Sequence, residues 1–202
     1  GPLEFEAVLH ATGRRANTEG LGLENTDIEL RPNGTIVVDE FCQTAVENVF
    51  AVGDVNGGLQ FTYVSLDDFR VVNGYLHGNK EYTTADRKNV PYSTFISPAL
   101  SHVGLHKEEA EAAYPNVAVA SLPVANMPRG AVNQDPRGLF RVTVDKDTNL
   151  ILGATLFGKN SEEIINLIKM AIDNKIPYTY IRDQIFTHPT MAENLNDVFK
   201  LI

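Results

Sequence analysis

The chain has 202 residues, 43% of them hydrophobic and 21% charged, a composition typical of globular proteins and long enough for two small domains. Its 17 basic and 26 acidic residues give a formal net charge of −9, which repels a phosphate backbone and excludes nucleic acid as an expected partner. The sequence has no uninterrupted apolar run of about 18 residues, so we expect no membrane-spanning helix.

The beginning of the chain indicates a piece of a longer protein. Gly1-Pro2 has the appearance of a protease scar, and residues 1–6 lack the basic start and apolar stretch of a secretory signal. Cys42 is the single cysteine, which excludes an internal disulfide and a zinc site built from several thiolates. A reducing compartment, the cytoplasm, is therefore the expected location.

The first half of the chain predicts the end of a nucleotide-binding region. Short runs rich in β-branched residues predict buried strands at 6–11, 35–39 and 48–52. Residues 62–78 carry apolar side chains at helical spacing, at Val64, Phe69, Val72 and Leu76. The charged, Thr-rich residues 81–91 are the expected linker, which places the domain boundary between residues 90 and 91.

The second half predicts an α+β domain with an antiparallel sheet, because its strands and helices do not alternate as βαβ units. Expected strands cover 101–105, 117–124, 138–145 and 150–158, and expected helices cover 107–114, the apolar stripe of 164–172, 178–185 and 191–201. Ser161 is the candidate N-cap of the second helix. The apolar positions Ile164, Ile165, Ile168 and Ile172 on it exceed what one small sheet needs to cover, which predicts a homodimer, although core packing could absorb them.

Gly53 and Asp54 follow the strand predicted at 48–52. Backbone without a Cβ allows a ligand to approach closely at Gly53, and ligands of open α/β sheets bind at the carboxyl ends of strands. The helix expected from Thr62 would present free N–H groups and the positive end of its dipole. On these residues alone, a plain turn is an equally good interpretation.

Two segments carry a family resemblance. The run ATGRRANTEGLGLE, followed by TAVENVFAVGDV, resembles the second half of the flavoprotein pyridine nucleotide-disulfide oxidoreductases, the family of dihydrolipoamide dehydrogenase, glutathione reductase and mercuric reductase. The resemblance implies FAD and NAD(P)H as cofactors and a C-terminal dimerisation domain. It also implies that Asp54 holds the ribityl and phosphate region of FAD, and that Gly13 lies near the nicotinamide.

The same resemblance implies that the isoalloxazine edge contacts the residues after Asp54, namely Gln60, Phe61, Thr62 and Tyr63. Two departures from the family pattern stand out. Ala16 replaces the usual proline, and Phe61-Thr62-Tyr63 replaces the commoner Leu-Thr-Pro, a change that bears on how the helix start meets the flavin.

The stretch His188-Pro189, followed by Glu193, is the candidate catalytic element. A carboxylate that holds one imidazole nitrogen leaves the other as a proton acceptor near neutral pH. For an isolated His-Pro, a surface histidine at a helix entry would be the better interpretation. The stretch resembles the family's H-P-T-x-x-E signature, which implies that His188 and Glu193 form an acid/base pair acting in the partner subunit's flavin site.

The runs FTYVSLDDFR and FTHPTMAENLNDVF resemble a branch of the family, the mercuric-reductase-like bacterial flavoproteins of reactive-chlorine resistance. This resemblance implies a full-length oxidoreductase that passes hydride from NAD(P)H through FAD to a disulfide, or to a thiol-held metal ion such as copper(II). The fragment alone would then bind flavin poorly. The alternatives are a non-catalytic homodimerisation module with a vestigial His-Glu pair, and a flavin reductase that uses no thiols.

Other residues receive structural interpretations. Cys42 is expected to be a buried structural thiol, and Asp67-Asp68 a solvated acidic patch. His102 and His106 have a spacing compatible with a metal but no third ligand, so no metal site is predicted. Residues 127–130 are expected to form a loop.

Overall fold

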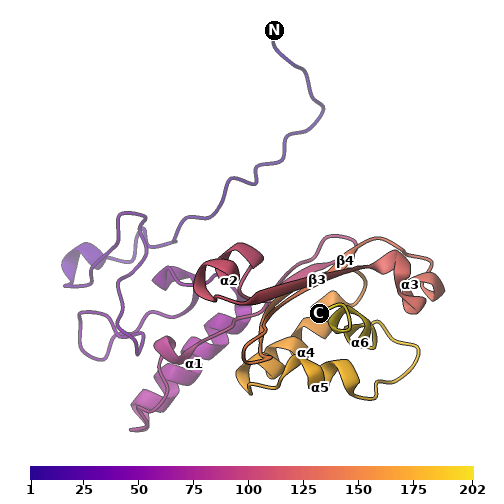
Figure 1. Cartoon of the computed structure of the whole chain (residues 1–202). Helices are drawn as coiled ribbons and strands as arrows, with labels where there is room; N and C mark the ends of the chain where they lie inside the picture. The colour runs from indigo at the N-terminus through magenta and orange to yellow at the C-terminus, as the bar shows by residue number, and fades with distance from the viewer. The chain divides into compact units, whose positions relative to one another are not determined.

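The computed structural model describes all residues, 1–202, and divides them into two compact units, Gly1–Arg87 and Lys88–Ile202 (Figure 1). Each unit has its own secondary structure. The first is mostly loop around one long helix, and the second is a sheet with helices. No helix in the chain is long and apolar enough to cross a membrane.

The first unit contains one α-helix, α1 (Thr62–Leu76), and three short 3-10 helices, η1 (Leu23–Asn25), η2 (Gly53–Asn56) and η3 (Thr84–Asp86). Two isolated β-bridges, Leu30 with Ile36 and Gln43 with Phe50, are its only strand pairing.

The strands predicted at 6–11, 35–39 and 48–52 were therefore wrong as regular elements. A strand is stabilised by hydrogen bonds to a neighbour, and these segments have at most an isolated bridge. Residues 6–11 are fully exposed and run as an extended trace at the amino-terminal end of the chain (Figure 1).

Helix α1 forms where the apolar spacing predicts it, but its buried face differs from the expected one. Val64, Asp68 and Val71 are buried, whereas Phe69 and Leu76 are exposed. The buried positions follow the i, i+4, i+7 spacing of one helix face, and a carboxylate occupies the middle one.

The second unit is built on a five-stranded antiparallel sheet in the order β1-β2-β5-β4-β3. Its strands are β1 (Tyr92–Thr94), β2 (Leu100–Gly104), β3 (Val117–Pro123), β4 (Leu139–Asp145) and β5 (Ile151–Phe157). This confirms the predicted α+β class with an antiparallel sheet. Strand β1 was not predicted, because three residues carry too short a pattern to show alternation.

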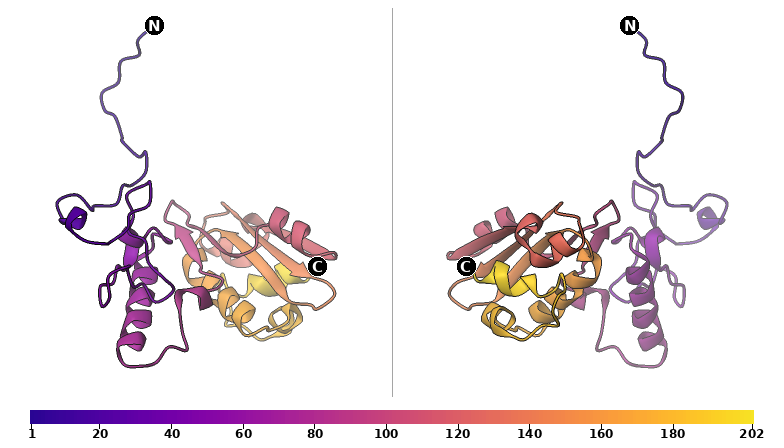
Figure 2. Two further views of the ribbon diagram at one scale, coloured as in Figure 1. Left: turned by 90° about the vertical axis from the view of Figure 1, so that its left-hand side faces the viewer. Right: turned by 90° about the vertical axis from the view of Figure 1, so that its right-hand side faces the viewer.

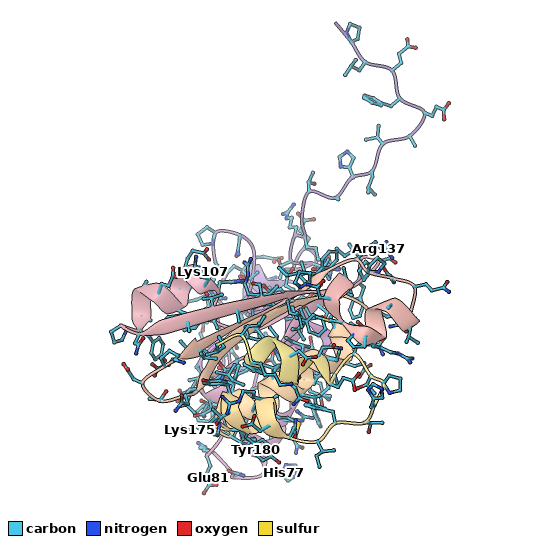
Figure 3. The ribbon with its side chains drawn as sticks, turned by 45° about the vertical axis from the view of Figure 1, so that its right-hand side comes forward. His77, Glu81, Lys107, Arg137, Lys175 and Tyr180 are labelled. Carbon is cyan, nitrogen blue, oxygen red and sulfur yellow. The ribbon has the colours of Figure 1, made fainter.

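The helices of this unit are α2 (Lys107–Ala113), α3 (Pro128–Val132), α4 (Ser161–Asp173), α5 (Tyr178–Asp183) and α6 (Asn194–Phe199). Helices α4, α5 and α6 lie on one face of the sheet (Figures 1 and 2). Figure 3 shows Lys107 and Arg137 on one side of this unit, and Lys175 and Tyr180 of the helical layer on the other.

The hydrophobic core lies between the sheet and these three helices. Its largest fully buried side chains come from both layers: Val103, Val124, Met127, Phe140, Val142, Val144, Leu156, Ile165, Ile168, Leu195 and Phe199. The surplus of isoleucines on α4 that suggested a dimer is absorbed here, since Ile164, Ile165 and Ile168 are buried in the chain's own core. The exposed large apolar residues of α4 are instead Leu167 and Met170.

Two local predictions were wrong. Residues 128–132 form the short helix α3, not a loop, because Pro128 stands at its first turn, where a missing N–H costs nothing. Ser161 is not the N-cap of α4: Asn160 holds that position with a left-handed backbone. The Ser161 hydroxyl is buried and donates to the carbonyl of Ala99 at 2.8 Å.

Candidate functional site

His188 and Glu193 lie on the segment between α5 and α6, and their side chains meet. Nδ1 of His188 is 2.8 Å from Oε2 of Glu193. The turn that folds the chain back contains Thr190, whose hydroxyl donates to the carbonyl of Thr187 at 2.8 Å and accepts the Glu193 N–H at 3.2 Å. The His188–Pro189 peptide bond is cis, within the range of geometries that a histidine-proline pair permits.

The two partners differ in exposure. The Glu193 side chain is 16% exposed and the His188 side chain 74% exposed. Glu193 precedes α6, whose Leu195, Val198 and Phe199 are buried in the core, so the carboxylate stands on a well-packed element. The carboxylate accepts a hydrogen bond from the Nδ1–H tautomer, which leaves the Nε2 lone pair of an exposed ring open to a reactant.

Gly53 and Asp54 begin η2 in the first unit. Gly53 has a left-handed backbone, φ +74°, and a Cβ there would lie 2.8 Å from the Ser65 hydroxyl, so the close packing of η2 on α1 requires glycine. The Asp54 carboxylate is half-exposed and lies 3.3 Å from Nη1 of Arg14. That contact links Asp54 to Arg14, the residue after Gly13.

Gln60, Phe61, Thr62 and Tyr63 lead into α1. Phe61 occupies the N-cap position, no side chain caps the helix, and its first turn holds no acidic residue. Gln60, Thr62 and Tyr63 are exposed. The positive dipole end of α1 is therefore not neutralised by a side chain, and the half-exposed Asp54 carboxylate belongs to the same unit.

These residues fit one edge of an FAD site. A carboxylate can accept hydrogen bonds from ribityl hydroxyls, and an uncapped start of a 15-residue helix favours the electron-rich edge of a flavin ring. Gly53, Asp54 and residues 60–63 lie along η2 and α1, which are in contact. His188 and Glu193 belong to the other unit.

The structural interpretation of Cys42 is confirmed, and that of Asp67-Asp68 is wrong. Cys42 is buried, as expected, and burial, with a smaller effect of the nearby Asp68 carboxylate, raises its pKa to about 12. Asp67-Asp68 is not a solvated patch, since Asp67 is 13% and Asp68 1% exposed. Asp68 lies four residues after Val64 and four before Val72, on the predicted apolar face of α1, and this spacing could have indicated its burial.

The rings of His102 and His106 are stacked at a centroid separation of 3.7 Å. Both ring nitrogens of His102 are hydrogen-bonded, to the Thr155 hydroxyl at 2.8 Å and the Gly104 carbonyl at 3.0 Å. No group of three or more potential metal-ligating side chains occurs in the structure.

Comparison with known proteins identifies the family. The family model described as pyridine nucleotide-disulphide oxidoreductase, dimerisation domain, matches residues 90–199, and that of the pyridine nucleotide-disulphide oxidoreductases matches residues 2–68. The chain belongs to the pyridine nucleotide-disulphide oxidoreductase family. Members of this family are oxidoreductases that use FAD and NAD(P)H.

Several curated relatives align along nearly the whole chain. It is 48% identical over 200 residues to the probable pyridine nucleotide-disulfide oxidoreductase RclA of Escherichia coli (strain K12), covering 99% of this chain and 45% of the relative. It is 34% identical over 191 residues to glutathione reductase of Burkholderia cepacia, covering 95% of this chain and 42% of the relative. The chain thus spans less than half the length of these relatives.

A solved structure of a relative has the same fold as this chain. The HOCl-induced flavoprotein disulfide reductase RclA from Escherichia coli matches with a TM-score of 0.92 at 48% identity, over 95% of this chain and 44% of that one. The predicted family and the predicted dimerisation-domain fold are confirmed by these similarities, and the resemblance predicted within the family agrees with the 48% identity to RclA.

Proposed function

We propose that this chain is the C-terminal part of an FAD-dependent NAD(P)H oxidoreductase of the disulfide-reductase type. Residues 1–90 would complete the FAD/NAD(P)-binding region, and residues 91–202 would form the dimerisation domain. The functional assembly would be a homodimer in the cytoplasm. The family match over both halves and the high identity to a flavoprotein disulfide reductase support this proposal.

One observation carries the catalytic part of the proposal: an imidazole held by a nearly buried carboxylate yet open to solvent. Nδ1 of His188 lies 2.8 Å from Oε2 of Glu193. Glu193 fixes the ring orientation and the tautomer, and it stabilises the cation that forms when Nε2 accepts a proton. In the proposed dimer, Nε2 takes the proton of a substrate or enzyme thiol in the partner subunit's redox centre and returns it in the reverse step.

The cofactor side of the proposal uses the first unit. When bound, FAD supplies the redox centre that transfers two electrons from NAD(P)H to the acceptor. Asp54 would accept hydrogen bonds from the ribityl chain, and Gly53, whose missing Cβ lets η2 pack against Ser65 of α1, would set the position of Asp54 beside the ligand. Residues Gln60–Tyr63 would contact the ring edge at the α1 start, and Gly13 would lie near the nicotinamide.

The acceptor would be a disulfide or a metal ion held by thiols. Reduction of a disulfide consumes one NAD(P)H and one proton and yields NAD(P)⁺ and two thiols, so a proton-transfer residue is required. The RclA protein of Escherichia coli has also been solved as a Cu(II) complex. We therefore include copper(II) among the candidate acceptors; one NAD(P)H would reduce two copper(II) ions to copper(I) and release one proton.

Substitution of His188 by Ala in the full-length protein tests the catalytic assignment. General acid–base groups contribute about 10²- to 10⁴-fold, so we expect turnover with NAD(P)H and acceptor to fall by roughly 100-fold or more while FAD stays bound. His77→Ala is the matched control, because His77 is also exposed and its Nδ1 contacts only the Asn73 carbonyl. Unchanged turnover in the His188 variant would favour a non-catalytic homodimerisation module with a vestigial His-Glu pair.

A second measurement addresses the remaining alternative, a flavin reductase without thiols. Stoichiometric labelling of NAD(P)H-reduced, full-length protein at a cysteine pair, absent in the oxidised protein, supports disulfide chemistry. Equal labelling in both states would support the thiol-free reductase. The isolated 202-residue chain is expected to retain little flavin, and stoichiometric flavin absorbance after purification would contradict that expectation.

A further inference from the structure

A buried carboxylate lies directly against the η2 segment. Asp68 projects from α1 and is 1% exposed. Its Oδ2 accepts the Gly53 N–H at 2.8 Å and the Asn56 side-chain amide at 2.9 Å. Gly53 and Asn56 are the first and last residues of η2, so a single oxygen atom fixes both ends of the turn that carries Asp54.

The other oxygen of Asp68 is paired with a cation. Oδ1 of Asp68 lies 2.5 Å from Nη2 of Arg87, whose Nε donates to Oδ2 of Asp67 at 2.7 Å. The pKa of Arg87 is raised: its burial acts to lower the pKa, and the hydrogen bonds to Asp68 and Asp67 more than offset that. A buried carboxylate is costly without a partner, and Arg87 supplies one while leaving Oδ2 available to η2.

The orientation of Asp54 depends on this arrangement. Its side-chain partner, Arg14, lies 3.3 Å away, and the Arg14 side chain is largely exposed and that of Asp54 half-exposed. Exposed ion pairs hold a side chain weakly. The direction of the Asp54 carboxylate is therefore set mainly by the backbone of η2, which Asp68 holds at its two ends.

We propose that Asp68 is a positioning residue for the flavin site, fixing the Gly53–Asn56 backbone so that Asp54 faces the ligand, with Arg87 as its counter-ion. This inference rests on the proposed function, in which Asp54 contacts FAD. Asp68 itself touches no ligand. It acts through the Gly53 peptide and the Asn56 amide.

The chain offers a matched pair of variants for the test, Asp68→Asn and Asp67→Asn. Both remove one carboxylate charge next to Arg87, but only Asp68 contacts η2. An Asn at position 68 presents its NH₂ group toward donors, either in η2 or on Arg87, and one hydrogen bond is replaced by a donor–donor contact.

The experiment measures FAD affinity by reconstitution of the apo form of the full-length protein, and the midpoint potential of the bound flavin by dye equilibration. We expect Asp68→Asn to weaken FAD binding by about tenfold or more and to shift the potential, and Asp67→Asn to change affinity by less than about threefold with no shift. A purely structural role would lower the thermal midpoint of both variants without moving the potential. Equal effects of both variants on affinity, with an unmoved potential, would overturn the inference.

Asp54→Asn separates the inference from the proposed function. Loss of FAD affinity in Asp54→Asn with wild-type affinity and potential in Asp68→Asn overturns the positioning role alone. Unchanged FAD affinity in Asp54→Asn would contradict the proposed contact between Asp54 and FAD, and with it the positioning role of Asp68. If Asp68→Asn does not fold, Asn56→Ala removes the second contact of the same oxygen. Weaker FAD binding in that variant supports the inference, and wild-type binding overturns it.

Discussion

Nδ1 of His188 lies 2.8 Å from Oε2 of Glu193, and the carboxylate is nearly buried while the imidazole is exposed. This asymmetry assigns different physical roles to the two groups. Glu193 is held by the packed start of α6 and can orient a ring, whereas His188 can reach a reactant outside its own chain. The other carboxylate oxygen, Oε1, is buried without a hydrogen-bond partner, so Oε2 is the atom that holds the ring.

The first prediction concerns coupling within this pair. Glu193→Gln keeps the side-chain shape but removes the charge that stabilises the imidazolium, so turnover of the full-length protein should fall by roughly tenfold or more. If Glu193 acts through His188, then adding Glu193→Gln to His188→Ala should cost little beyond His188→Ala alone. Steady-state kinetics of the two single variants and the double variant measure this, and fully additive losses would contradict a shared role.

The second prediction concerns pH. Burial lowers the pKa of His102, with the neighbouring His106 acting in the same direction and the Gly104 carbonyl and Glu109 acting against it. The native state therefore keeps the ring neutral at pH values where the unfolded chain protonates it, near the ordinary histidine pKa of about 6.5. The unfolded state then binds more protons, so stability falls as pH drops below about 6.5 toward the lowered native pKa.

Denaturant midpoints of the chain at about pH 7.5 and about pH 5.5 test this sign. The midpoint should decrease on acidification, and His102→Gln should reduce the decrease. His10→Gln is the matched control, since His10 is exposed in the amino-terminal segment. An equal pH dependence in wild type and His102→Gln would show that the buried ring does not contribute.

The third prediction concerns Cys42. Because burial, with help from Asp68, raises the thiol pKa to about 12, almost no thiolate exists at about pH 8, and thiolate is the reactive form. A thiol reagent should leave the native chain unlabelled and label one site per chain in denaturant, since the chain has a single cysteine. Rapid labelling under native conditions would show that the segment around Cys42 opens readily.

The sequence predicted the second unit better than the first, and the reason is physical. Strands β2 to β5 and helix α4 bury their apolar faces against each other within residues 88–202, so local patterns and final structure agree. In the first unit, the runs at 6–11, 35–39 and 48–52 have strand composition but lack neighbouring strands to pair with. Composition alone could not reveal that their partners are missing.

Only part of the candidate site could be predicted from the sequence. The spacing of His188 and Glu193 allowed a pair, but the Thr190 turn that brings them together is visible only in three dimensions. The role of Asp68 was missed because two adjacent acids usually indicate a solvated face. Its cation, Arg87, lies 19 residues further along the chain, so no local pattern joins them.

The last prediction concerns α4, whose buried residues stabilise the core and whose exposed apolar residues are candidates for the dimer interface. Ile168 is 0% and Leu167 42% exposed, although they are neighbours on one helix. Ile168→Ala leaves a cavity in the core and should reduce the free energy of unfolding by about 2–5 kcal/mol. Leu167→Ala removes only exposed surface and should cost less than about 1 kcal/mol in the same measurement.

Because Leu167 and Met170 are the exposed large apolar residues of α4, the double variant Leu167→Ala, Met170→Ala should instead weaken dimerisation, measured by analytical ultracentrifugation. A dimer of unchanged affinity in that variant would exclude this helix face from the interface, and loss of folding in it would show that the two residues serve the core.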